Sequence, residues 1–385
     1  MRSMRACLVL LAAGLGLPAV SAAAPSERHY LYVAEPGVRD YVQWGGAGIL
    51  VFDIDNGHSF VRRIETPASR EPKPDNIKGI CGNAATRRLY FTNTKKLFCL
   101  DLVSERPLWD KPLPQGCDRL AMTPDGKTLY VPSLERDIWN VVDGATGELL
   151  SPITTRSGAH NTACGLDGTR MYLAGLKSPI LTVADPRTNQ VVGHVGPFAA
   201  GIRPFTVNGA QTRVYVNVNE LLGFEIGDLT TGKKLARIEV QGFERGPVKR
   251  HSCPSHGIGL TPDEKELWLA DAHNSRMHVF DLTADPPKQI ASLPLREQPG
   301  WVTFSLDGRY AYPSTGEVFD VKTKTRVTAL QDEKGREVHS EKMVEIDFKD
   351  GMPVRVGDQF GLGRVIPEKS QIQTPARSER QPSER

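Results

Sequence analysis

The sequence predicts an all-β protein, a seven-bladed β-propeller closed by pairing of its N- and C-terminal segments. One pattern occurs seven times: an apolar stretch with an aromatic residue is followed, a few residues later, by a second apolar stretch that ends in aspartate. These aspartates are Asp53, Asp101, Asp143, Asp185, Asp228, Asp281 and Asp320, at intervals of 48, 42, 42, 43, 53 and 39 residues. A period of about 40–50 residues with several strands in each unit is typical of propeller blades.

The third repeat shows the predicted unit most clearly. An apolar run at 120–122 ends in Thr-Pro-Asp-Gly, in which proline and glycine stand where turn geometry favours them. Residues 128–133, 138–143 and 149–153 follow as further strands, and the last two are separated by a second glycine-containing turn. Four short strands with turns between them make one blade.

The two ends of the chain are predicted to complete one blade together. The first repeat begins at its second strand, with no inner strand before Tyr30. Residues 343–348, near the other end, have the pattern of an innermost strand without a repeat of their own. We therefore expect this C-terminal segment to supply the inner strand of the first blade. Such closure leaves no sheet edge free to pair with other chains.

The repeats resemble the YVTN repeat family of seven-bladed β-propellers. The resemblance is carried by TPDGKTLYVPS…NVVDGATGELL and TPDEKELWLAD…MHVFDL and covers about residues 30–350. It implies the fold but no single activity, because related propellers include extracellular binding proteins, lactonases, lyases and the large subunits of quinoprotein dehydrogenases. The usual Val-Ala-Asn after the aromatic residue is replaced at 131–133 and at 269–271.

Both ends of the sequence are predicted to lie outside the propeller, which we assign to residues 25–366. Residues 1–24 combine early arginines, an apolar run and small residues, the pattern of a cleaved signal peptide. The apolar run is shorter than the roughly 20 residues needed to cross a bilayer, so we expect a periplasmic or secreted protein without a membrane span. Residues 367–385 have no aromatic and only one large aliphatic residue, which predicts a disordered tail.

Composition and motifs exclude several classes of function. The net charge is +3 with mixed signs, so the sequence does not indicate a basic surface that binds nucleic acid. The chain has no GxSxG elbow, no HExxH, no phosphate-cradling glycine loop and no CxxCH haem motif. The sequence identifies no cofactor, and we expect a monomer.

Candidate site residues follow from the repeat itself. In six repeats, the residue twelve positions before the repeat's aromatic residue directly precedes the innermost strand, and in a propeller these positions gather around the axis on one face. They are Lys78, Asp118, His160, Arg203, His256 and Gly300, and the next position adds Arg119 and Trp301. The first blade is expected to contribute from 339–343, in an ambiguous register.

Two insertions are expected on the same face, and long loops on a rigid scaffold often carry binding sites. One is 35–48, and the other is 242–255. Their polar and aromatic residues include Arg39, Tyr41, Trp44, Arg245, Lys249, Arg250 and His251. The alternative is a solvated channel mouth with no ligand. His273 and His278 are interpreted as surface residues.

The charge at these positions suggests the ligand. Cations outnumber anions, so a carboxylate or phosphate is favoured, with Arg203 as a bidentate partner. The first hypothesis is therefore a module that binds an anionic small molecule or a partner protein. A second is an enzyme of lactonase or lyase type, in which Asp118, His160 or His256 is the base. A third is a subunit of a periplasmic redox complex.

A metal ion is a further alternative for the same face. Asp118, His160 and His256 form a two-histidine, one-carboxylate set of the kind that binds transition metals. Lys78 and Arg203 would repel a divalent cation. We therefore assign no metal from the sequence and keep these three residues as candidates only.

Overall fold

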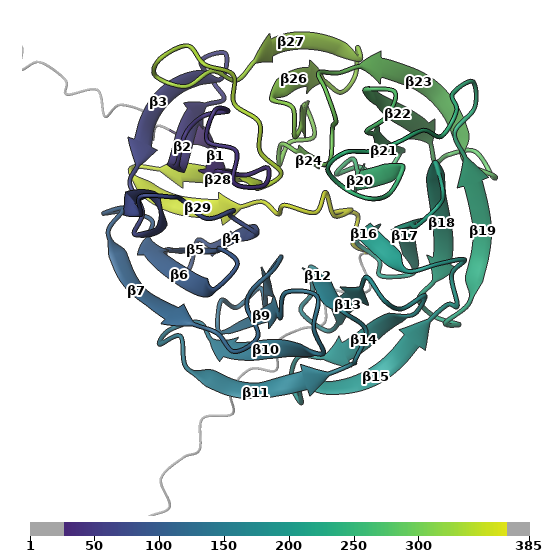
Figure 1. The fold of residues 1–385 in the computed structure, drawn as a ribbon, viewed down its shortest axis with the longest axis horizontal. Helices are drawn as coiled ribbons and strands as arrows, with labels where there is room; N and C mark the ends of the chain where they lie inside the picture. Colours follow the sequence, from purple (N-terminus) through teal and green to yellow (C-terminus); the bar gives the residue numbers. More distant parts are fainter. Residues whose placement is uncertain (1–26, 368–385) are drawn as a thin grey trace, which may run out of the picture.

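The computed structural model describes residues 27–367 and shows seven antiparallel sheets arranged as a ring around a central axis (Figure 1). Six sheets have four strands and one has five. Apart from one short 3-10 helix, η1 (Ala68–Arg70), these residues form strands, turns and loops. The predicted seven-bladed β-propeller is confirmed. The predicted signal peptide and nearly all of the predicted tail lie outside the described residues.

The strands follow one another blade by blade, from the channel outward. The first blade contains β29 (Met352–Val356), β28 (Met343–Lys349), β1 (Glu27–Glu35), β2 (Gly48–Asp53) and β3 (Ser59–Ile64). The second contains β4 (Gly79–Asn83), β5 (Arg88–Thr92), β6 (Lys96–Asp101) and β7 (Pro107–Pro112), and the third contains β8 (Ala121–Met122), β9 (Thr128–Pro132), β10 (Ile138–Asp143) and β11 (Leu149–Thr154). The fourth contains β12 (Ala159–Cys164), β13 (Met171–Gly175), β14 (Leu181–Asp185) and β15 (Gln190–Val195), and the fifth contains β16 (Ile202–Val207), β17 (Arg213–Val218), β18 (Gly223–Asp228) and β19 (Lys234–Glu239). The sixth contains β20 (Ser255–Leu260), β21 (Glu266–Asp271), β22 (Arg276–Asp281) and β23 (Lys288–Pro294), and the seventh contains β24 (Val302–Phe304), β25 (Tyr310–Pro313), β26 (Glu317–Asp320) and β27 (Thr325–Ala329).

The repeated aspartate at the end of each third strand holds the turn that follows it. In the third blade, Oδ1 of Asp143 accepts hydrogen bonds from the backbone N–H groups of Ala145 and Thr146, both at 2.8 Å. An aspartate that bonds its own backbone two or three residues later favours a tight turn. The repeat's aspartate is therefore a turn residue.

The first blade closes the ring in the predicted way. β28 pairs antiparallel with β1, with Tyr30 opposite Ile346. The structure adds β29, which pairs with the inner side of β28 and gives this blade its fifth strand. The two ends of the chain are thus joined by backbone hydrogen bonds within one sheet.

A segment that the sequence did not predict fills part of the channel. Residues 357–365, which we call the plug, follow β29 and cross the middle of the ring (Figure 1). The carbonyl of Gly361 accepts hydrogen bonds from the backbone N–H of Leu260 at 2.8 Å and from the hydroxyl of Thr206 at 2.6 Å. Phe360 packs edge-to-face on Trp301, with ring centroids 5.8 Å apart. The plug therefore bonds to inner strands of several blades at once.

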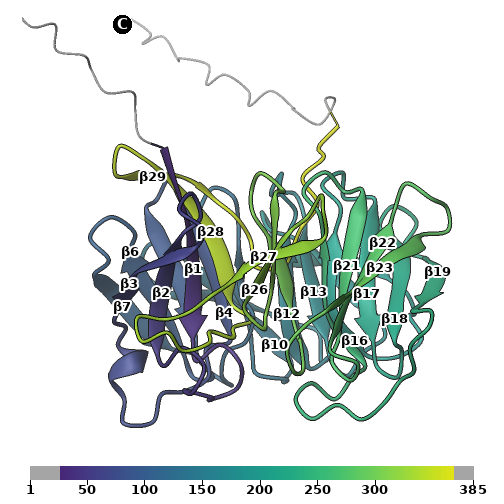
Figure 2. The ribbon, with the colours of Figure 1, turned by 90° about the horizontal axis from the view of Figure 1, so that it is seen from above.

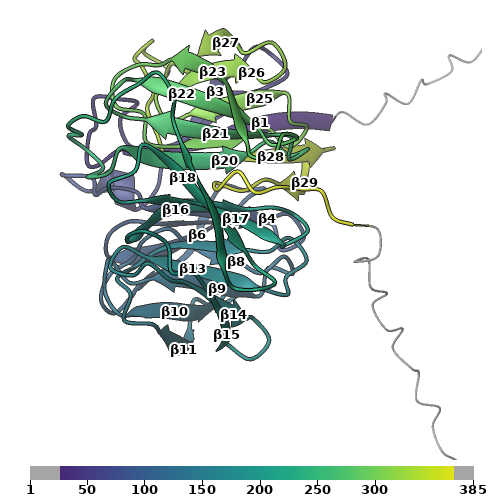
Figure 3. The same ribbon diagram turned by 90° about the vertical axis from the view of Figure 1, so that its right-hand side faces the viewer.

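The two faces of the ring differ. The start of β1 and the exit of the chain after the plug lie on one face, as the side views show (Figures 2 and 3). The long loops 35–48 and 242–255 and the 3-10 helix lie on the other face (Figure 2). Within 27–367, no helix has the length and apolarity that crossing a membrane would need.

Candidate functional site

A cavity of about 130 Å³ lies at the channel mouth on the face of the long loops. We call this cavity the cup. Five of the predicted ligand-binding residues line it: Lys78, Arg119, His160, Arg203 and His256. The rest of its wall is made by Arg39, Asn76, Glu135, Leu176, Arg250, His251, Ser252, Glu341 and Lys342. The shared register thus brings together side chains from five blades.

Asp118 lies beneath the wall of the cup, where it organises two of the lining residues. Its carboxylate accepts a hydrogen bond from Nδ1–H of His160 at 2.5 Å and lies 3.3 Å from Nζ of Lys78. Although burial opposes its charge, His160 and Lys78 hold the pKa of Asp118 below its usual range. Burial lowers the pKa of His160, against the raising effect of Asp118. The imidazole is therefore oriented with Nε2 as its free lone pair, as a buried carboxylate orients a catalytic histidine.

Trp301 also lies beneath the cup and does not line it. The guanidinium of Arg119 sits 3.8 Å from the centroid of the Trp301 indole, a cation–π contact. Arg119 also donates to the buried carboxylate of Glu341. The indole N–H donates to the carbonyl of Gln359 in the plug. Trp301 therefore connects the plug to Arg119 in the wall of the cup.

Arg203 has no acidic partner, and among the cations that line the cup it shares this property in the described structure only with Arg39, which is exposed on its loop. Its Nε donates to the side-chain oxygen of Asn219 at 2.6 Å, and no carboxylate among residues 27–367 forms an ion pair with it. By contrast, Lys78 pairs with Asp118, and both Arg119 and Lys342 pair with Glu341. The charge of Arg203 is therefore uncompensated within the described structure.

The two long loops meet over the mouth of the cup. Arg39 of one loop donates to the backbone carbonyl of Arg250 in the other. The Arg250 guanidinium lies 4.4 Å from the ring centroid of Trp44, and Trp44 stacks on His339 at 4.4 Å. Tyr41 packs edge-to-face on Trp44. These contacts form a cationic and aromatic rim around the cup.

Glu341 and Lys342 are site residues that the sequence indicated only as a range. The lysine Nζ donates to the carbonyl of Gly37 at 2.7 Å and to Glu341 at 3.2 Å. Burial lowers the pKa of Lys342 to about 7, against the raising effect of Glu341. Although burial opposes its charge, Lys342 is the main group that holds the pKa of Glu341 well below its usual range. The first blade therefore contributes one carboxylate and one amine to the cup.

The histidines of the cup differ from the predicted metal set. His256 stacks on His251, with centroids 4.3 Å apart, whereas His160 pairs with Asp118. Among the described residues, only His256 of the three predicted candidates belongs to a group of close metal donors, and its companions are His251 and Glu341. The interpretation of His278 as a surface residue is wrong: it is buried on β22, where its ring bonds Asp271 and Ser292. His273 is exposed.

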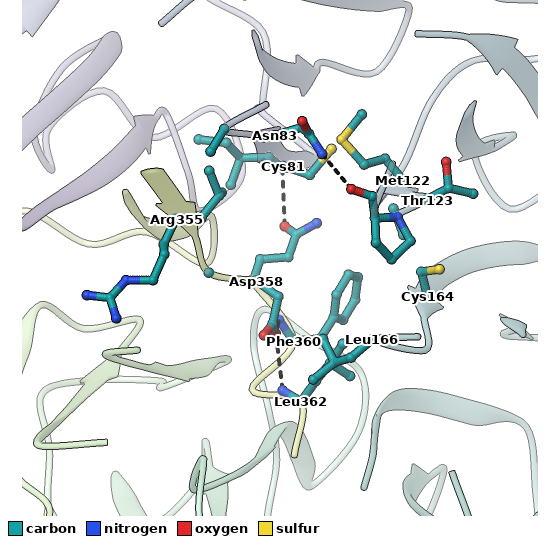
Figure 4. Close-up of a pocket in the computed structure, with 18 of the residues that line it drawn as sticks. Cys81, Asn83, Met122, Thr123, Cys164, Leu166, Arg355, Asp358, Phe360 and Leu362 are labelled. Carbon is teal, nitrogen blue, oxygen red and sulfur yellow. Dashed lines mark hydrogen bonds between the residues drawn. The ribbon is translucent and has the colours of Figure 1, made fainter. Parts of the chain in front are cut away.

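A second cavity, of about 330 Å³, opens at the other end of the channel. Its wall includes Cys81, Met122, Cys164 and Leu166 at the ends of inner strands, together with Phe360 of the plug (Figure 4). Most of its lining side chains are apolar, and the charged ones among the described residues are Arg355 and Asp358. The plug therefore separates two mouths of different chemistry.

Comparisons with known proteins support the fold and no more. The chain matches no protein-family model and no curated protein. Among solved structures it is similar to a chain described as Kuenenia stuttgartiensis hydrazine synthase, with a TM-score of 0.58 and 14% identity. The match covers 72% of this chain and 88% of that chain. Because the identity is so low, the likeness shows a shared propeller fold alone, and the resemblance to the YVTN family stays a prediction.

Proposed function

We propose that the protein is a binding module that holds a small anion, a carboxylate or a phosphate, in the cup. The observation that carries this proposal is Arg203, a guanidinium in the wall of the cavity without an acidic partner among the described residues. A partly buried cation without a counter-ion is costly, and an anionic ligand would supply the missing charge. A planar guanidinium also matches the two oxygens of a carboxylate or phosphate.

The charges of the whole cup point the same way. Six arginines and lysines line it, against two glutamates, and a third carboxylate, Asp118, lies just beneath. Two unit charges 4 Å apart interact by about 4 kcal/mol at an effective dielectric near 20. Several cations around one small cavity therefore favour an anion strongly over a neutral ligand.

The size of the cup limits the ligand. A cavity of about 130 Å³ equals the share of roughly four water molecules in the liquid. Inorganic phosphate or the acidic end of a short carboxylic acid fits this space. A larger ligand would have to extend past the rim formed by Arg250 and Trp44.

Titration calorimetry tests the proposal with phosphate, acetate, malonate and citrate as the probes. We expect at least one of them to bind, and Arg203→Ala to weaken that binding by about tenfold to a hundredfold, since a hydrogen bond to a charged group contributes roughly 1.5–3 kcal/mol. Arg213→Ala is the matched control, because Arg213 lies in the same blade but pairs with Asp228 away from the cup.

Two results would contradict anion binding. One is that none of the four probes binds at low ionic strength, where charge interactions are least screened. The other is that Arg203→Ala and Arg213→Ala have the same affinity as the unmodified protein. Either result would leave the cup as a solvated channel mouth.

An enzyme of lactonase or lyase type is the second candidate, and the Asp118–His160 pair favours it. A neutral imidazole held by a buried carboxylate can act as a general base through Nε2. In such an enzyme, Arg203 would stabilise developing negative charge. His160→Ala should then abolish turnover of lactone or uronate substrates while the melting temperature stays nearly unchanged. If the unmodified protein turns over none of a set of lactone and uronate substrates, this candidate is excluded.

We further propose that the module works outside the cytoplasm, on the strength of the signal-peptide pattern in residues 1–24. A partner protein on the rim and a place in a periplasmic redox complex remain hypotheses, and the similar solved chain supports neither because it shares only the fold. Fractionation of cells that express the full chain tests export, and retention of an uncleaved chain in the cytoplasm would contradict it.

A further inference from the structure

Two histidines and one carboxylate meet in the wall of the cup. His251, His256 and Glu341 each offer one donor atom, and the three atoms lie within 4.8 Å of one another. His251 comes from the long loop before β20, His256 lies on β20, and Glu341 precedes β28. The side chains of His251 and Glu341 are only 8% and 6% exposed.

Two of these donor atoms have no other partner in the fold. Nε2 of His251 and Oε1 of Glu341 are buried, and neither forms a hydrogen bond with any residue in 27–367. They face each other at 3.3 Å. A tetrahedral ion with ligands at about 2.0–2.1 Å holds its donor atoms about 3.3 Å apart, so the pair already has the spacing of two ligands of one ion.

The surroundings of the pair suit a third ligand. His256 donates Nδ1–H to the backbone carbonyl of Gly300 at 2.9 Å, which leaves Nε2 as its lone pair. Histidines that bind metals usually donate their other nitrogen in this way. A Cβ on Gly300 would lie 2.3 Å from Nε2 of His251 and 2.5 Å from Oε1 of Glu341, so only glycine leaves room beside the donors.

We propose that His251, His256 and Glu341 bind a divalent transition-metal ion of the zinc or ferrous-iron class. Two histidines and one carboxylate are the protein ligands of many catalytic zinc and non-haem iron sites, which keep a position open for water or substrate. All three residues line the cup, so the open position faces it. This site is independent of the anion proposed above, because none of its ligands is Arg203.

Neighbouring charges set the strength of this site. Arg119 and Lys342 both donate to the other carboxylate oxygen of Glu341, Oε2. They orient the carboxylate and leave Oε1 available, but they also oppose a cation by like charge. We therefore expect the ion to bind more weakly than in a site without neighbouring cations.

The test uses the purified full chain, first freed of metal with a chelator and then dialysed against buffered Zn²⁺ from nanomolar to micromolar free concentration. We expect about one equivalent of bound zinc by elemental analysis. His251→Ala and His256→Ala should each weaken binding at least ~100-fold, because even the loss of a residue that only supports a ligand costs 10–100-fold. His194→Ala, which removes an exposed histidine on the outer strand β15, is the control and should bind like the unmodified protein.

Co²⁺ provides a second readout that needs no variant. Intense visible absorption bands of four- or five-coordinate Co²⁺ with imidazole ligands would support the site even if a variant fails to fold. The spectrum of the free aqueous ion would overturn the proposal. It would also be overturned if His251→Ala kept full affinity, or if only His29→Ala lost it, since His29 lies with Glu27 and Asp347 in the other group of close donors.

Discussion

The plug makes a quantitative prediction about stability. Phe360 is 3% exposed and packs on Trp301 and the core around β16, so Phe360→Ala removes a fully buried ring. Replacing a buried phenylalanine by alanine typically costs about 3–5 kcal/mol of unfolding free energy. At about 2.1 cal/mol/K of unfolding entropy per residue, a domain of this length should lose about 4–7 °C in melting temperature.

Thermal melting and hydrogen exchange together measure this effect. The full decrease in melting temperature is observed if the plug leaves the channel only when the propeller unfolds. If the plug detaches first, the melting shift is smaller and the amide of Leu260, which bonds Gly361, exchanges faster instead. Val365→Ala is the matched control, because Val365 lies in the same segment and is 50% exposed. A melting shift below about 1 °C together with unchanged exchange at Leu260 would refute the role of the plug in the core.

Three further predictions concern buried groups. Burial and a neighbouring carboxylate raise the pKa of Glu345 to about 9, so its contribution to stability is complete below its usual pKa and is lost as the pH rises towards 9. The unfolding free energy, measured by denaturation at several pH values, should therefore change less between about pH 5 and pH 9 in Glu345→Gln than in the unmodified protein. The same pH dependence in both proteins would contradict this prediction. Asp118→Asn should cost about 3–5 kcal/mol at pH 7, because it removes the counter-charge of the half-buried Lys78 and the carboxylate that holds His160. The cost should shrink as the pH falls below about 4, where the contribution of the carboxylate is lost, and a cost independent of pH would contradict the ion pair with Lys78. Gly257→Ala places a Cβ 2.4 Å from Cα of Trp301 and should lower the unfolding free energy by about 1–3 kcal/mol, measured in thermal melts. Gly193→Ala is the control, because the nearest atom to its new Cβ lies at 4.0 Å. Equal melting temperatures of the two variants would show that the strands can move apart.

The fold could be predicted because its information is local and repeated. Each aromatic residue and each terminal aspartate marks the same strand of its blade, and the aspartate's bonds to the following turn explain why it recurs. Four of the six register positions line the cup for the same reason, since equivalent positions of equivalent blades point to the same mouth, whereas Asp118 lies beneath the wall and Gly300 does not line it. Lys78, His160 and Arg203 are examples.

The rest of the site depends on contacts that no repeat encodes. The plug has no strand pattern, and its hydrogen bonds go to several blades, so residues 357–365 carry no local signal. Glu341 lies where the chain re-enters the first blade, in a loop without a register to count from. His278 alternates with apolar neighbours on β22, but both sides of this strand are packed, so alternation there does not separate buried from exposed residues.

The start of β1 and the exit of the chain after the plug both lie on the face opposite the long loops (Figures 2 and 3). A tag or a fused domain joined directly at either of these two places is therefore attached to the face opposite the cup. The molecule can be immobilised on a sensor chip through such a group while the rim of Arg250 and Trp44 points into the medium. The path of the chain through the described residues thus fixes the orientation, and coupling the protein next to β1 or after the plug leaves the cup accessible.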